Sequence, residues 1–139
     1  MDSESATDKP KHISRAPSLW HSFRFAAEGM WYAVRTQRNL RIHFGAAAIV
    51  MVLARWLQVS RIVWAILVLL IGLVLAAELI NTVVEAVVDL VSPDYHPLAK
   101  IAKDVAAAAV LTVSITAVVV GLFLLGPPLW EALFPVVQS

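Results

Sequence analysis

Two long apolar stretches fill the second half of the chain, and a short polar segment joins them. Residues 62–77 contain no charged, amide or hydroxyl side chain, and residues 98–125 are charged only at their start. Because the helical pattern of the first stretch continues well beyond residue 77, both exceed the roughly 20 residues that cross a bilayer. The pattern predicts spanning helices over 61–90 and 98–125. The Gly-Pro-Pro sequence at 126–128 predicts the end of the second helix.

The first sixty residues are less apolar and carry more charge. From 18 to 34, apolar residues recur with helical spacing among polar ones, which predicts an amphipathic helix on the membrane surface. A polar extension of the next helix is the alternative. The apolar run that follows is short, so we expect a spanning helix over 38–57 that includes arginines at its start. Residues 1–17 mix Ser, Asp, Lys and Pro and predict a disordered tail.

The composition supports an integral membrane protein. The 139 residues are 60% hydrophobic, with a mean hydropathy of +0.77, which is more than a soluble core of this size needs. Seven of the eleven basic residues precede residue 44, which favours a cytoplasmic N-terminus. The fold class that we expect is therefore all-α and integral to the membrane, with three transmembrane helices, an N-terminal surface helix and one domain over 18–139. The absence of cysteine excludes disulfides and thiolate chemistry.

Polar residues on the helix predicted over 61–90 lie on one face. At 100° per residue, four of them fall within a stripe about 80° wide: Glu78, Asn81, Glu85 and Asp89. A charged side chain at membrane depth costs about 2.5–3.5 kcal/mol or more, so this stripe should face other protein. The next helix begins with charged residues at a similar depth, and Lys103 and Asp104 are the expected partners.

Three interpretations of this stripe are open. It can be an interfacial ion network with Lys100 and Lys103, which an assembly subunit would use to pair helices, or an ion or proton pathway of a small proton-coupled carrier. The outer halves of both helices carry no polar chain that would continue a pathway. The third interpretation is phosphoryl transfer, in which one carboxylate deprotonates a lipid hydroxyl and another, roughly 10 Å along the helix, holds Mg²⁺. The chain has neither a Walker loop nor a protein-kinase glycine loop.

The run from Ala77 to Asp89, with Tyr95-His96 and Ala102-Lys103-Asp104, resembles the signature of the prokaryotic diacylglycerol kinase and undecaprenol kinase family. The resemblance covers about residues 20 to 125. It implies a small homotrimeric membrane kinase with three spanning helices and a surface helix, whose active sites are shared between protomers.

The resemblance also implies roles for individual residues. Glu78 matches the catalytic base, Asn81 a polar residue that supports it, and Glu85 a Mg²⁺ ligand that also lies at the ATP site. The family commonly has a glutamate as second metal ligand where this chain has Gln37, a position that also lies at the ATP site. The amide oxygen can coordinate Mg²⁺ without the charge of a carboxylate, and Gln37 can be a ligand, a hydrogen-bond donor to phosphate or a bystander. Four further residues match positions that contact ATP: Asp94, His96, Lys103 and Asp104.

We therefore expect an ATP-dependent lipid kinase that uses Mg²⁺ and has no nucleic-acid partner. Residues 35–43 look more like the undecaprenol kinase branch, so undecaprenol is the first expectation for the acceptor and diacylglycerol the second. The expected location is the bacterial plasma membrane, with the N-terminus and the active site on the cytoplasmic side.

Overall fold

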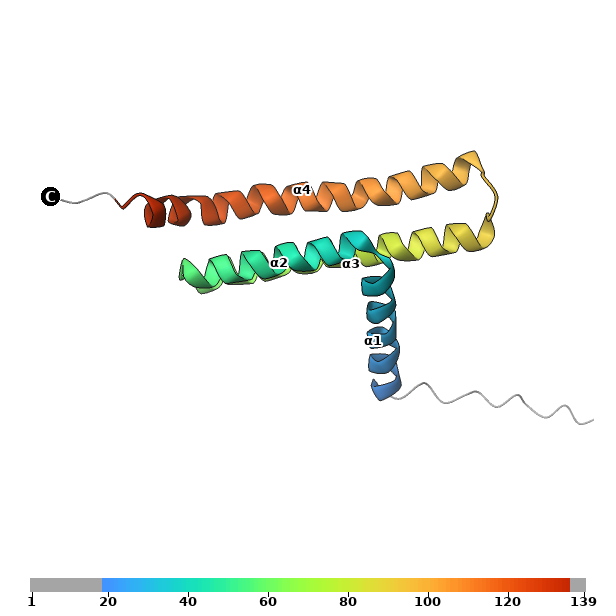
Figure 1. Cartoon of the computed structure of the whole chain (residues 1–139), viewed down its shortest axis with the longest axis horizontal. Coiled ribbons are helices and arrows are strands. Elements are labelled where there is room, and N and C mark those ends of the chain that lie inside the picture. The colour runs from blue at the N-terminus through green and yellow to red at the C-terminus, as the bar shows by residue number, and fades with distance from the viewer. Residues whose placement is uncertain (1–18, 136–139) are drawn as a thin grey trace, which may run out of the picture.

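The computed structural model describes residues 19–135, which form four helices and no strand (Figure 1). The helices are α1 (Leu19–Thr36), α2 (Arg38–Trp56), α3 (Arg61–Val91) and α4 (Pro97–Leu133). This confirms the all-α class. The tail expected over 1–17 lies outside the described residues.

Local sequence signals explain where α3 and α4 begin. The hydroxyl of Ser60 accepts a hydrogen bond from the Val63 N–H, which caps α3. The Nδ1 atom of His96 accepts from the Leu98 N–H at 3.2 Å and caps α4. Pro97 is the first residue of α4, where its missing N–H leaves no helical hydrogen bond unmade.

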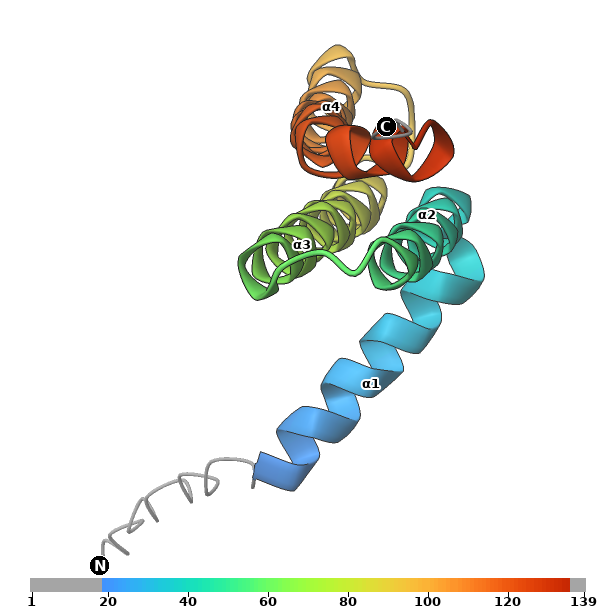
Figure 2. The ribbon, with the colours of Figure 1, turned by 90° about the vertical axis from the view of Figure 1, so that its left-hand side faces the viewer.

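Helices α2, α3 and α4 run alongside one another, and α1 runs across their direction (Figure 1). Seen end-on in Figure 2, the three lie at the corners of a triangle, and α3 packs against both of the others. An apolar core joins them at the end away from the α3–α4 connection, where Ala54, Leu67 and Leu125 are buried together. At the opposite end, α3 and α4 extend past the corner between α1 and α2 (Figure 1).

Two of the described helices, α3 and α4, are long and apolar enough to cross a membrane. In the most apolar 18-residue stretch of each helix, only 17% (α3) and 11% (α4) of the residues are buried within the chain, so their side chains mostly face outward. Helix α2 does not meet the same criterion, because Arg38, Arg41 and Arg55 lower the hydropathy of its 19 residues. A third spanning helix therefore stays a prediction.

The predicted end of the last helix at residues 126–128 is wrong, because α4 continues through both prolines to Leu133. A proline within a helix removes one hydrogen bond and crowds the preceding turn, which kinks the helix without necessarily ending it. Figure 2 shows the final turns of α4 running across the axis of its longer part. The other helix bounds lie within two residues of those expected.

The apolar core at the end of the bundle away from the α3–α4 connection leads to a prediction about packing. Ala54 has 0% exposure and lies against Leu67 and Leu125, so replacing it with leucine forces extra volume between three helices. We expect Ala54→Leu to lower the free energy of unfolding by about 1–3 kcal/mol in detergent micelles. Ala48→Leu, at an exposed position of the same helix, is the matched control. An equal loss in both variants would contradict this packing.

Candidate functional site

The polar stripe of α3 passes from buried to exposed along the helix. Glu78 is 2% exposed and Asn81 is 6% exposed, whereas Glu85 is half-buried and Asp89 is exposed. The prediction that the stripe faces other protein is thus confirmed for Glu78 and Asn81. Thr82, which the sequence analysis did not single out, is also buried, and its hydroxyl donates to the Glu78 carbonyl oxygen at 3.0 Å.

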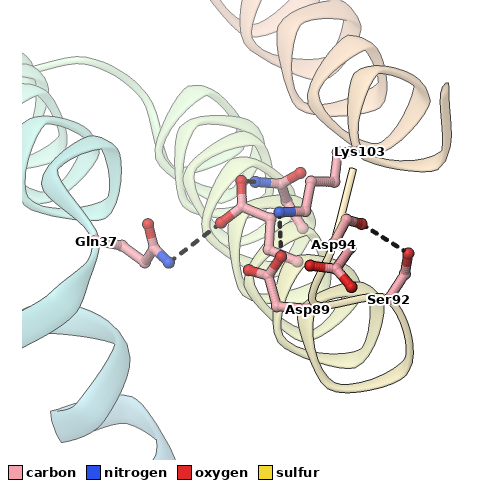
Figure 3. Close-up of polar contacts among 7 residues, drawn as sticks. Gln37, Asp89, Ser92, Asp94 and Lys103 are labelled. Carbon is pink, nitrogen blue, oxygen red and sulfur yellow. Dashed lines mark hydrogen bonds and ion pairs between the residues drawn. The ribbon is translucent and has the colours of Figure 1, made fainter. Parts of the chain in front are cut away.

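Glu85 is held by two amide groups (Figure 3). The Nδ2 atom of Asn81 donates to Oε1 of Glu85 at 3.1 Å, and the Nε2 atom of Gln37 donates to Oε2 at 3.3 Å. Asn81 lies one turn earlier on α3, but Gln37 comes from the corner between α1 and α2. The structure therefore brings together three of the site residues expected from the sequence.

Two buried polar groups beside this cluster lack partners. The Glu78 side chain makes no hydrogen bond or ion pair with any residue in 19–135, and Oδ1 of Asn81 is buried without one. A buried polar atom without a hydrogen bond costs about 1–3 kcal/mol, and more if it is charged. Such groups are expected where a ligand or another chain supplies the missing contact.

The charged residues beyond Glu85 form two ion pairs. Lys103 of α4 pairs with Asp89 of α3 (Figure 3), and Lys100 pairs with Asp104 one turn along α4. The interfacial network expected from the sequence is thus present for Asp89. It does not include Glu85, which accepts from neutral amides instead.

Asp94 and His96 lie in the exposed connection between α3 and α4. The Asp94 carbonyl oxygen accepts a hydrogen bond from the Ser92 hydroxyl at 3.1 Å (Figure 3), and His96 caps α4. Among the described residues, neither side chain contacts Gln37 or Glu85. The structure places them at the same end of the bundle as the cluster without joining them to it.

The oxygen atoms around Glu85 suit a hard divalent cation. No group of three or more His, Cys, Asp or Glu residues in the described part of the chain is placed to hold a metal. Mg²⁺ does not need such a group, because it is commonly held by one or two carboxylates, several waters and substrate phosphates. The Glu85 carboxylate, each of whose oxygens accepts a single hydrogen bond from a neutral amide, fits that pattern.

An apolar groove of about 380 Å³ lies between α2, α3 and α4. Its walls include Val74 and Leu75, one turn from Glu78, and its few polar lining residues include His43 of α2 and Ser114 of α4. The contacts Gln37–Glu85 and Lys103–Asp89 show which residues of the antiparallel helices lie at the same level along the bundle. Counting 1.5 Å per residue from these contacts, His43 and Ser114 lie at about the level of Glu78. No sequence signal predicts the groove, because its walls are the apolar residues that any spanning helix contains.

These features define a small helical protein with membrane-length helices and a carboxylate site at one end of them. The sequence matches the model of the prokaryotic diacylglycerol kinase family over residues 24–125. The chain belongs to this family.

Individual relatives agree with this assignment. A diacylglycerol kinase of Synechocystis sp. is 52% identical over 115 residues, which are 82% of this chain and 66% of that protein. An undecaprenol kinase of Bacillus subtilis is 38% identical over 122 residues, 88% of this chain and 99% of the relative. A diacylglycerol kinase of Escherichia coli is 40% identical over 80 residues, 58% of this chain and 66% of the relative. The expected class of enzyme, a lipid kinase, is confirmed by these matches.

The exposed ion pair leads to a second prediction. The side chains of Lys103 and Asp89 are 37% and 64% exposed, and such pairs contribute at most about 1 kcal/mol. We expect Asp89→Asn to lower the free energy of unfolding by no more than this, and the difference from wild type to vanish in 1 M salt. A larger loss that persists in salt would show that Asp89 has another structural partner.

Proposed function

We propose that this protein transfers the γ-phosphoryl group of ATP to the hydroxyl group of a membrane lipid. The observation that carries the proposal is the position of Glu78. The residue is 2% exposed, and its carboxylate has no hydrogen-bond partner in residues 19–135. It lies at the depth where the apolar groove begins, two helical turns from the amide-held Glu85. A hydroxyl at the end of a lipid chain and a soluble phosphate donor can meet between these two carboxylates.

In this reaction Glu78 acts as the general base. Its carboxylate takes the proton of the lipid hydroxyl while the hydroxyl oxygen forms a bond to the γ-phosphorus. The bond from phosphorus to the β–γ bridging oxygen breaks, and ADP leaves with that electron pair. Asn81 supports the site through its amide, since Nδ2 is used by Glu85 while the buried Oδ1 is free to accept a hydrogen bond from the substrate.

The nucleotide side of the site lies toward the α3–α4 connection. Glu85 holds Mg²⁺, which when bound neutralises charge on the transferring phosphates, and Gln37 lies beside it. Lys103 and Asp104 on α4, with Asp94 and His96 in the connection, contact the ATP. The Lys103 ammonium can leave Asp89 and pair with a phosphate of the nucleotide instead, because the ion pair between Lys103 and Asp89 is partly exposed and weak.

Undecaprenol is the first choice of acceptor and diacylglycerol the second. The Bacillus subtilis undecaprenol kinase is matched over 99% of its length. The groove between the three helices is almost wholly apolar, so it suits the hydrocarbon of either lipid.

The working form is a homotrimer in the bacterial plasma membrane, with the N-terminus and the site on the cytoplasmic side. Helix α2 is the third spanning helix and α1 is an amphipathic surface helix. The outward-facing apolar residues of α3 and α4 support contact with lipid and with further copies of the chain. Neighbouring protomers complete each site.

A phosphate-transfer assay tests the proposal. Labelled γ-phosphate from Mg-ATP is offered to undecaprenol and to diacylglycerol side by side in mixed micelles, and the extracted lipids are counted. The ratio between the two labelled lipids identifies the acceptor. A folded protein that labels neither lipid would overturn the proposal.

Glu78→Gln should lower the turnover number by at least about a hundredfold, because a general base typically contributes 10²–10⁴ in rate. The variant should fold as well as wild type or better, since it replaces a buried carboxylate that has no partner. Thermal unfolding in the same micelles measures the second effect. The matched control is Glu131→Gln on the exposed last turn of α4, and equal activity in both variants would remove Glu78 as the base.

Glu85→Gln should raise the Mg²⁺ concentration for half-maximal activity by about tenfold or more, because a neutral amide replaces a charged ligand. A Mg²⁺ titration of the initial rate at saturating ATP measures this shift. If the titration curve coincides with that of wild type, Glu85 is not a metal ligand.

A further inference from the structure

Gln37 occupies an unusual place in the chain. It is the single residue between α1, which ends at Thr36, and α2, which begins at Arg38, and its backbone is extended (φ −97°, ψ 113°). It is therefore the corner at which the chain turns from α1 into the bundle (Figures 1 and 2).

A buried apolar residue lies on each side of the corner and holds it in place. Ala33, four residues before Gln37, is 2% exposed, and Leu40, three residues after it, is 0% exposed. The Gln37 N–H also continues the hydrogen bonding of α1 by donating to the Ala33 carbonyl oxygen at 2.8 Å. The side chain of Gln37 therefore starts from a fixed backbone.

That side chain does not cap the helix it precedes. Gln37 is at the N-cap position of α2 but makes no capping hydrogen bond, and its Nε2 atom instead donates to Oε2 of Glu85 across to α3. An ionised carboxylate only accepts hydrogen bonds, so the amide nitrogen must face Glu85 and the amide oxygen must face away. This geometry makes Gln37 a hydrogen-bond donor to Glu85.

The two amide donors bind different oxygens of the Glu85 carboxylate. Asn81 donates to Oε1 and Gln37 to Oε2, so each oxygen receives one hydrogen bond and keeps a lone pair. Asn81 is on the same helix as Glu85 and restrains it only from α3. Gln37 lies 48 residues away in the sequence and is the contact that orients the carboxylate relative to a second helix.

We propose that Gln37 is a positioning residue that orients the Glu85 carboxylate for a divalent cation and does not itself bind the cation. This inference rests on the proposed function in one respect, namely that Glu85 is the cation ligand. A hydrogen-bond donor that fixes a ligand lowers the entropy lost when the ion binds, as partners of metal ligands do in other sites.

The test measures cation binding without nucleotide. Binding of Mn²⁺ to the full-length protein in micelles is followed by electron paramagnetic resonance for wild type, Gln37→Ala, Glu85→Gln and Asn39→Ala. Asn39 is the matched control, because it is an exposed amide residue two positions further on. We expect Gln37→Ala to weaken Mn²⁺ binding by about tenfold to a hundredfold, the equivalent of one hydrogen bond to a charged group, and Asn39→Ala to leave it unchanged.

A second measurement separates orientation from direct coordination. The chain contains only three glutamines, so the side-chain carbonyl band of ¹³C-glutamine can be followed by infrared spectroscopy and assigned with Gln37→Ala. We expect the Gln37 band to keep its frequency when Mg²⁺ is added. A shift of that band, together with weaker Mn²⁺ binding in Gln37→Ala, would make the amide oxygen a ligand and overturn the inference.

The remaining outcomes distinguish the inference from the proposed function. If Glu85→Gln loses Mn²⁺ binding while Gln37→Ala keeps wild-type affinity, the positioning role is wrong and the metal site at Glu85 stands. If Glu85→Gln binds Mn²⁺ as wild type does, the cation is not at Glu85, and that part of the proposed function fails together with the inference.

Discussion

The cost of placing carboxylates on an apolar helix governs this structure. Along about 16 Å of α3, three of them meet three different environments. Glu78 is buried with no partner among the described residues, Glu85 accepts from two neutral amides, and Asp89 is exposed and paired with Lys103. Burial without a partner is the most expensive of the three arrangements, and it coincides with the residue proposed as the general base.

The same carboxylates hold the helices together at one end of the bundle. Glu85 contacts the corner between α1 and α2, and Asp89 contacts α4, so α3 is joined to both neighbours by polar contacts there. The opposite end is held by the apolar cluster around Ala54 and Leu67. The bundle thus has a polar end that is weakly held and open to ligands, and an apolar end that fixes the packing. Such a division suits the proposed reaction, in which a nucleotide would enter from water and a lipid from the bilayer.

Helical periodicity was enough to predict much of this arrangement. A rotation of 100° per residue puts Glu78 and Asn81 on one face, and the high cost of exposing them to lipid predicts their burial, which the structure confirms. The contact between Gln37 and Glu85 could not be predicted in the same way, because it depends on how α2 packs against α3. The path of α4 beyond Gly126 was missed because a proline signal alone does not distinguish a bend from an end. The groove arises only where three apolar helices meet, and no single residue type marks it.

The short turn between α2 and α3 acts on the site from the other end of the molecule. Gln58 has a left-handed backbone (φ 50°), and the Val59 N–H donates to the Ala54 carbonyl oxygen, so a tight turn joins the two helices. One residue inserted within α3, between this turn and Glu85, would rotate Glu85 by about 100° about the helix axis and carry it away from Gln37. The geometry around Glu85 therefore depends on the number of residues in α3 as well as on side chains, over the roughly 36 Å of helix between this turn and Glu85.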